Sequence, residues 1–165
     1  MDIAVSIAVP GDITALCGLL QVLFSQEAEF RPDHEAQARG LAAIVGDPAT
    51  GEILVARGGG RVLGMVSLLY TVSTALGARV AWLEDMVVLA ETRGAGVGGA
   101  LLDAALAHAA RRGCRRVTLL TDADNVAAQR FYQRRGFQHS PMIPMRLLLD
   151  TPGIASTEDD RTAVD

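Results

Sequence analysis

The chain has 165 residues, of which 50% are hydrophobic and 21% are charged, and its formal net charge is −4. This length suits one globular domain, and the composition excludes a disordered chain. The acidic balance argues against a nucleic-acid-binding protein, and no apolar run is long enough to span a membrane. No basic segment precedes the first apolar residues, so we expect no signal peptide and a cytoplasmic protein. Cys17 and Cys114 are predicted to be reduced thiols, not a disulfide or a zinc site.

The first half of the chain predicts a strand, two helices and two hairpins. Small and β-branched residues favour a strand over 3–9, which Pro10-Gly11 ends. Apolar residues at helical spacing predict a helix that begins at Asp12 or Thr14 and runs to about Glu29. A second helix is predicted from its cap at Asp33 to about Val45. Two strands follow over 52–57 and 61–71, joined by glycines 58–60, and a turn over 75–78 leads to a strand over 79–89.

The second half changes to an order of strand, glycine-rich loop, helix and strand. The helix is expected over about 97–112 and the strand over 116–121, which together indicate a βαβ unit with a parallel strand pair. Several capping residues over 122–125 predict another helix, which Gly136 ends after about Arg135. Two short final strands are expected, one from Phe137 onward and one over 145–149, with a bend at Pro141 and Pro144 between them.

These elements predict an α+β fold, with a mixed and mostly antiparallel sheet that carries helices on both faces. We expect a single domain over residues 1–150 and a mobile tail over 151–165, because the tail is polar and has no periodicity. An exposed final strand could pair with a second copy of the chain, so a homodimer is a further expectation.

The glycine-rich loop is the strongest chemical signal in the chain. Gly94, Gly96, Gly98 and Gly99 stand where a helix begins, and there exposed amides and the helix dipole attract anions. The pattern Gly94-x-Gly96-x-x-Gly99 also matches a dinucleotide-binding fingerprint, which would make the protein an oxidoreductase. That alternative is disfavoured because the glycines do not follow their strand at once and an antiparallel meander precedes them.

A different spacing within the same loop, Arg93-x-x-Gly96-x-Gly98, resembles the acetyl-CoA signature of the GNAT superfamily of N-acetyltransferases. A second block follows one helix and one strand later, and it is similar to the motif that this family carries after its fifth strand. It reads Asn125-x-x-Ala128-x-x-Phe131-Tyr132-x-x-x-Gly136-Phe137. The two blocks in this order cover about 82–137 and make the resemblance specific.

The resemblance implies that acetyl-CoA is the co-substrate. In the family the strand before the loop diverges from its parallel neighbour and binds the pantetheine arm through its backbone, which here would be that of Met86, Val87 and Val88. Asn125 and Tyr132 would also contact the coenzyme. The pyrophosphate would lie on the loop, which comprises Arg93, Gly94, Ala95, Gly96, Val97, Gly98 and Gly99.

The resemblance also implies catalytic roles. Tyr132 would protonate the departing thiolate, and a phenol is a suitable donor for that step. Glu84 would be the base that removes a proton from the amine, with Asp85, His139 or a water molecule as open alternatives. Neighbouring strand residues point to opposite faces, so we expect only one of Glu84 and Asp85 to face the acyl group.

The acceptor is expected to be a primary amine of a small molecule or peptide, to which the acetyl group is transferred directly and without a metal. Candidate acceptor-binding residues are Glu29, Tyr70, Ser73 and Asp85. A coenzyme-A-binding module without catalytic activity is the remaining alternative.

Overall fold

The computed structural model describes residues 2–26 and 33–149, which fall into two compact units that divide between Asp122 and Ala123. The predicted single domain over 1–150 and the tail over 151–165 stay predictions. The second unit contains α4 (Val126–Gln133). The first unit contains β1 (Ala4–Ile7), the 3-10 turn η1 (Pro10–Asp12), α1 (Ile13–Gln26), α2 (His34–Gly46), β2 (Gly51–Gly58), β3 (Arg61–Ser73), β4 (Ala78–Val88), the 3-10 turn η2 (Ala90–Thr92), α3 (Val97–Arg111) and β5 (Val117–Leu119).

The first unit is built on one five-stranded sheet, in which the strands follow chain order from β1 to β5. The pairs from β1 to β4 are antiparallel, and β4 and β5 form the parallel pair. The βαβ unit through α3 explains this change of direction, because parallel neighbours need a long crossover connection. The predicted mixed and mostly antiparallel sheet is therefore confirmed.

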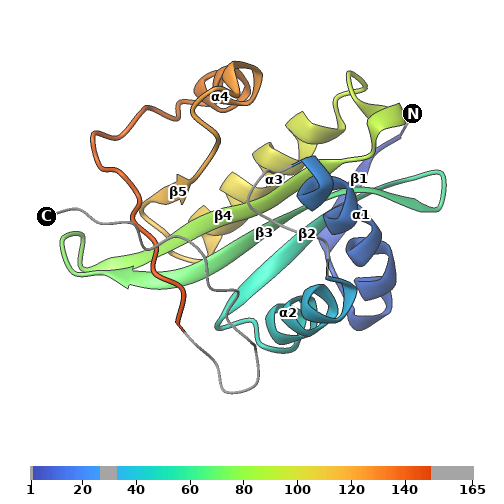
Figure 1. Cartoon of the computed structure of the whole chain (residues 1–165), viewed down its shortest axis with the longest axis horizontal. Helices are drawn as coiled ribbons and strands as arrows, with labels where there is room; N and C mark the ends of the chain where they lie inside the picture. The colour runs from blue at the N-terminus through green and yellow to red at the C-terminus, as the bar shows by residue number, and fades with distance from the viewer. Residues whose placement is uncertain (1, 27–32, 150–165) are drawn as a thin grey trace, which may run out of the picture. The chain divides into compact units, whose positions relative to one another are not determined.

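Helices cover both faces of this sheet (Figure 1). Leu16 and Leu20 of α1 and Leu41 of α2 are at most 3% exposed and pack with Val55 and Val87 of the sheet. We call this side the α1/α2 face. Helix α3 packs on the other side, the α3 face, through a buried stripe at helical spacing. Its members are Val97, Leu101, Leu102, Ala105 and Ala109.

An ion pair also stabilises the α1/α2 face at its edge. The Asp12 carboxylate lies 2.7 Å from the Arg57 guanidinium of β2 and accepts a hydrogen bond from the Val9 amide at 2.8 Å. These hydrogen bonds, chiefly the one from Arg57, lower the pKa of Asp12 although burial opposes them. The turn that leads into α1 is thereby tied to the end of β2.

Local signals correctly located two helix starts. Asp33 accepts a hydrogen bond from the Ala36 amide at 3.0 Å and caps α2, and Asn125 accepts one from the Ala128 amide at 3.1 Å and caps α4. In each case the capping side chain stands three residues before its donor, as an N-cap requires. The predicted end of the first helix near Glu29 lies outside the described residues.

The two predicted final strands are wrong, because residues 137–149 form no strand in the described structure. Pro141 and Pro144 each lack the amide hydrogen that a ladder needs. Six large apolar side chains between Met142 and Leu149 are 81–92% exposed. The homodimer prediction rested on such a strand and stays untested. Among the described residues, no helix has the length and apolar character needed to cross a membrane.

Candidate active site

The glycine-rich loop turns the chain sharply from η2 into α3. Gly94 and Gly96 have φ angles of 82° and 86°, a backbone region that side chains with a Cβ rarely adopt. Gly96 is the N-cap of α3 and has no side chain to accept from the first helical amides. Those amides have no preceding turn to pair with, so they remain available to a ligand.

The charge beside this loop is positive. Arg93 is exposed and makes no ion pair within the described residues. The nearby Glu91 carboxylate lies 3.1 Å from the Arg61 guanidinium, and its pKa is lowered by a hydrogen bond from its own backbone amide and by the one from Arg61. A dianionic group would therefore meet helix amides and a free guanidinium at the start of α3.

Within the described part of the first unit, the strand before the loop has an open edge. Strand β5 pairs with β4 only from Ala81 to Leu83, while β4 continues to Val88. On its other edge β4 stays paired with β3, where the Leu89 amide donates to the Leu63 carbonyl at 2.8 Å. Because backbone groups alternate along a strand, Val87 directs its N–H and C=O toward β3 and Val88 directs them toward the open edge.

The close approach of α3 to this strand depends on a glycine in β3. A Cβ added to Gly64 would lie 2.8 Å from the Val87 carbonyl oxygen and 3.0 Å from Leu101 of α3. Any side chain would therefore push β4 or α3 away. Gly64 therefore allows α3 to pack closely against the part of β4 that has the open edge.

A β-bulge lies in β4 just before the open edge. Met65 of β3 pairs with Val87 and Ser67 pairs with Glu84, so the two residues Asp85 and Met86 oppose one residue of β3. Asp85 has a φ of 51°, and among the described residues it is the non-glycine residue with positive φ. Aspartate tolerates this conformation better than most side chains.

Glu84 and Asp85 do not face opposite sides of the sheet, as strand alternation predicted, because the bulge lies between them and the next paired residue. Ser67 pairs across the sheet with Ile53, which belongs to the core under α1 and α2, so Glu84 lies on the α1/α2 face. Asp85 lines a cavity together with residues of both helices, so it faces the same side. The extra residue interrupts the period of two, and both acids are presented to one side of the sheet.

The cavity beside Asp85 has a volume of about 310 Å³. Its walls are apolar side chains of α1 and α2, including Leu20 and Ile44, and Asp33 lies at its margin. Gln37 also lines it, is only 7% exposed, and has no hydrogen-bond partner for its amide in the described structure. Gln37 was not predicted from the sequence, although a glutamine four residues before Leu41 on the apolar stripe of α2 was a usable signal.

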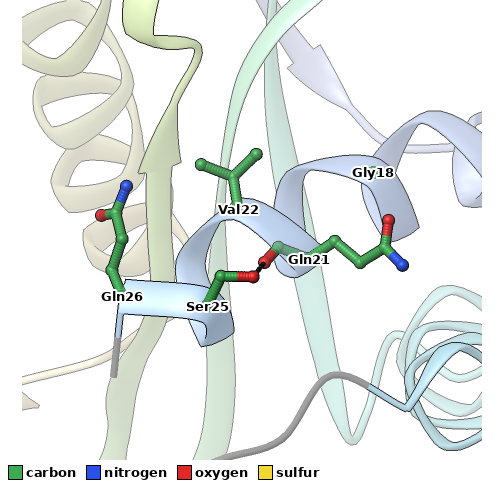
Figure 2. A pocket seen from close by; sticks show the side chains of 5 residues that line it. All are labelled: Gly18, Gln21, Val22, Ser25 and Gln26. Atoms are coloured by element: carbon green, nitrogen blue, oxygen red, sulfur yellow. Dashed lines mark hydrogen bonds between the residues drawn. The ribbon is translucent and has the colours of Figure 1, made fainter. Parts of the chain in front are cut away.

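A second hollow lies on the outer side of α1 and has a different character. Figure 2 shows Gly18, Gln21, Val22, Ser25 and Gln26 around it, all from one helix. The Ser25 hydroxyl donates to the Gln21 carbonyl at 2.6 Å, so that hydroxyl is used within the helix. With no charged side chain and one helix as its lining, it has no groups that could carry acyl transfer.

In the second unit, α4 carries the predicted motif residues. Tyr132 makes edge-to-face contacts with Phe131 and Phe137 at ring-centroid distances of 5.2 and 5.7 Å. Burial raises the pKa of the Tyr132 phenol. The phenol is therefore fully protonated at neutral pH and can donate a proton.

The family model of the GNAT acetyltransferases matches residues 15–137 of this sequence. The chain belongs to the GNAT acetyltransferase family. An uncharacterised N-acetyltransferase of Bacillus subtilis, YhfO, is 34% identical over 86 residues, which are 52% of this chain and 58% of that protein. The chain thus matches less than two thirds of the length of this curated relative.

Solved structures agree with this assignment. A putative acetyltransferase from Agrobacterium tumefaciens is 30% identical, with a TM-score of 0.74 over 87% of this chain and 99% of that one. A possible acetyltransferase from Clostridium difficile is 15% identical and has a TM-score of 0.81 over 90% and 99% of the two chains. The second likeness shows the shared GNAT fold alone.

The features of this GNAT chain suit acetyl-CoA. An amide-bearing arm would find backbone partners along the open edge of β4, and a pyrophosphate would find the first amides of α3 beside Arg93. A dinucleotide site of the Rossmann type does not fit, because the strand before the loop is antiparallel to its neighbour β3. Asn125 accepts from the Ala128 amide, so its side-chain oxygen serves as a helix cap.

The predicted acceptor residues do not all gather at the cavity. Tyr70 lies on the α3 face, where its hydroxyl donates to the Glu52 carboxylate at 2.6 Å, so its acceptor role stays a prediction. The Ser73 hydroxyl accepts from the Leu76 amide at 3.3 Å and holds the hairpin turn. His139, in the second unit, lies 3.1 Å from the Gln129 side-chain oxygen. Glu29 is outside the described residues.

Proposed function

We propose that this protein transfers the acetyl group of acetyl-CoA directly to a primary amine of a small molecule or peptide. The observation that carries the proposal is the open edge of β4 past Leu83, directly before a loop that presents α3 amides and Arg93. Together the two halves of this arrangement match an elongated ligand with amides at one end and phosphates at the other.

Acetyl-CoA would supply an activated acetyl thioester. The outward backbone groups of Val88, and of Met86 two residues earlier, would hold the arm and orient the carbonyl. The loop from Arg93 to Gly99 would bind the pyrophosphate. Val87 directs its backbone toward β3 and buries its side chain in the core of the α1/α2 face, so it would support the strand beneath the coenzyme.

Two side chains are proposed to move protons. Glu84, exposed beside the bulge, would take a proton from the acceptor ammonium, and the free amine would then attack the carbonyl carbon. Tyr132 would give its phenolic proton to the departing thiolate sulfur as the C–S bond breaks. The second proton of the acetylated nitrogen would pass to solvent, from which Tyr132 would recover one. Asp85, His139 or a water molecule remain the alternatives for the base.

The experiment is a panel of polyamines, amino acids, aminoglycosides and peptides, assayed by the release of free thiol from acetyl-CoA. Thiol release with at least one acceptor supports the proposal, and none above background contradicts it. Tyr132→Phe should lower kcat by about 10²–10⁴-fold without a matching loss of coenzyme A binding. Full activity in both Tyr132→Phe and Glu84→Gln would contradict the proposed proton-transfer roles, whereas coenzyme A binding without thiol release would favour a module that only binds the coenzyme.

Coenzyme binding can be tested apart from catalysis with Gly96→Ala. A Cβ at this N-cap strains the loop and displaces the amides, so coenzyme A binding should weaken about tenfold, as expected for one lost charge-assisted hydrogen bond. Gly77→Ala is the matched control, because Gly77 also has positive φ, 59°, but lies in the turn between β3 and β4. Equal losses in calorimetric affinity would remove the loop from the site.

A further inference from the structure

An unpaired amide lies inside the first unit, in the layer formed by α1 and α2. Both polar atoms of the Gln37 side chain are buried and have no hydrogen-bond partner in the described structure. Burying such a group without a partner destabilises a protein, so most natural interiors avoid it. The helical spacing from Gln37 to Leu41 and Ile44 is that of a core stripe, where an apolar side chain would be the favourable choice.

The unpaired amide faces a cavity and not solid packing. The cavity of about 310 Å³ is lined by Gln37 together with apolar side chains from both helices, among them Phe24 and Leu41. It also reaches Asp85 in the bulge of β4, next to the proposed base Glu84. A molecule in this space would therefore contact an apolar wall, one amide and one carboxylate.

We propose that this cavity binds the acceptor, and that Gln37 recognises an uncharged carboxamide carried by that acceptor. The inference rests on the proposed acetyl transfer. A carboxamide is the matching group because it donates and accepts side by side, as the Gln37 amide does, so two reciprocal hydrogen bonds form at once. The substrate class is a small α-amino amide with an apolar side chain.

The charges at the cavity separate this class from free amino acids. Asp33 and Asp85 contribute two carboxyl groups, and no basic side chain lines the cavity within the described residues. An ammonium group is favoured by this arrangement, whereas the carboxylate of a free amino acid is repelled. The volume is at the small end of ligand pockets, which span roughly 300–1,000 Å³, so a compact acceptor is expected.

Three amines with the same branched side chain test the inference: leucinamide, leucine and 3-methylbutylamine. In the native protein, kcat/KM should be highest for leucinamide and lowest for leucine. Gln37→Leu should lower the ratio of kcat/KM for leucinamide to kcat/KM for 3-methylbutylamine about five- to tenfold, because two neutral hydrogen bonds are lost. Gln21→Leu, the same substitution on the exposed side of α1, should leave every rate and ratio unchanged.

Asp85→Asn tests the charge argument, because asparagine also tolerates positive φ. In this variant the kcat/KM for leucine should come closer to the kcat/KM for leucinamide. An unchanged penalty would contradict the role of Asp85. An unchanged leucinamide preference in Gln37→Leu would contradict the carboxamide assignment.

A binding measurement separates failure of this inference from failure of the proposed function. Leucinamide should raise the Tm of the native protein more than 3-methylbutylamine does, and Gln37→Leu should abolish that difference. Without ligand, Gln37→Leu should have a Tm equal to or above the native one, because an unpaired buried amide is replaced by a similar apolar volume. A lower Tm would indicate a structural role for Gln37. Thiol release absent for every amine, with the binding difference intact, would overturn only the acetyl transfer.

Discussion

The two faces of the sheet differ in how far their buried polar groups are paired. On the α3 face the Glu52 carboxylate lies 2.7 Å from His108 of α3 and 3.0 Å from Nε of Arg112, the C-cap of α3, and it accepts from the Tyr70 hydroxyl. Arg112 Nε is buried and has this ion pair but no hydrogen bond within the described structure. On the α1/α2 face Gln37 and Ser67 have buried side-chain polar atoms without partners in the described structure. Polar groups that pair with one another stabilise the fold, whereas the unpaired Gln37 amide lines the cavity in which we expect the acceptor.

The largest expected effect is on catalysis, from the α1/α2 face. Glu84→Gln should lower kcat about 10²–10⁴-fold if Glu84 is the base, with little change in Tm because its side chain is exposed. Steady-state kinetics with the best acceptor measure it. Glu35→Gln, an exposed acid on α2, is the matched control and should retain full activity. A native-like kcat for Glu84→Gln would move the base to Asp85, His139 or water.

The next largest expected effect is on the free energy of unfolding and comes from a substitution on the α3 face. Glu52→Gln leaves the partly buried Arg112 and His108 without their carboxylate, so the free energy of unfolding should fall by about 3–5 kcal/mol. Urea denaturation measures the change. Glu91→Gln, which breaks the exposed pair with Arg61, is the control and should have little effect. Equal losses in both variants would show that the Glu52 cluster is no more important than a surface pair.

The same cluster predicts a pH dependence. Burial raises the pKa of Glu52, but the hydrogen bonds from Tyr70 and His108 outweigh it, so the pKa is lowered overall. The pKa of glutamate in an unfolded chain is about 4.3, and a lower pKa in the folded protein stabilises the fold at pH values above it. This contribution is lost as the pH falls through the pKa that Glu52 has in the folded protein. The difference in unfolding free energy between native protein and Glu52→Gln should therefore shrink below about pH 4.3. A difference that grows on acidification would contradict the assignment.

Two smaller changes compare the faces directly. Tyr70→Phe removes a donor to a charged acceptor on the α3 face and should cost about 1.5–3 kcal/mol of unfolding free energy. Ser67→Ala removes an unpaired hydroxyl on the α1/α2 face and should leave the unfolding free energy unchanged or slightly raised. Thermal unfolding of both variants measures the contrast. Similar losses would mean that the Ser67 hydroxyl has a partner in solution, which would weaken the distinction between the faces.

Features that depend on nearby residues were predictable from the sequence. The caps at Asp33 and Asn125 are confirmed, since a capping side chain reaches only three residues ahead. The glycine loop was also found, because positive φ at Gly94 and Gly96 is a local demand. The final strands failed because a strand exists only when a neighbour pairs with it, and apolar composition over 145–149 does not guarantee one.

The sequence by itself determined the order of elements from β1 to α4, the family and the start of α3, because periodicity, capping and glycine content act over a few residues. Only the tertiary structure decided which face each polar side chain occupies. The bulge at Asp85 placed both acids on the α1/α2 face, pairing across the sheet assigned Tyr70 to Glu52, and the packing of α1 on α2 left Gln37 without a partner. The physical reason is that register and pairing depend on residues far apart in the chain, and one extra residue in a strand reverses its faces.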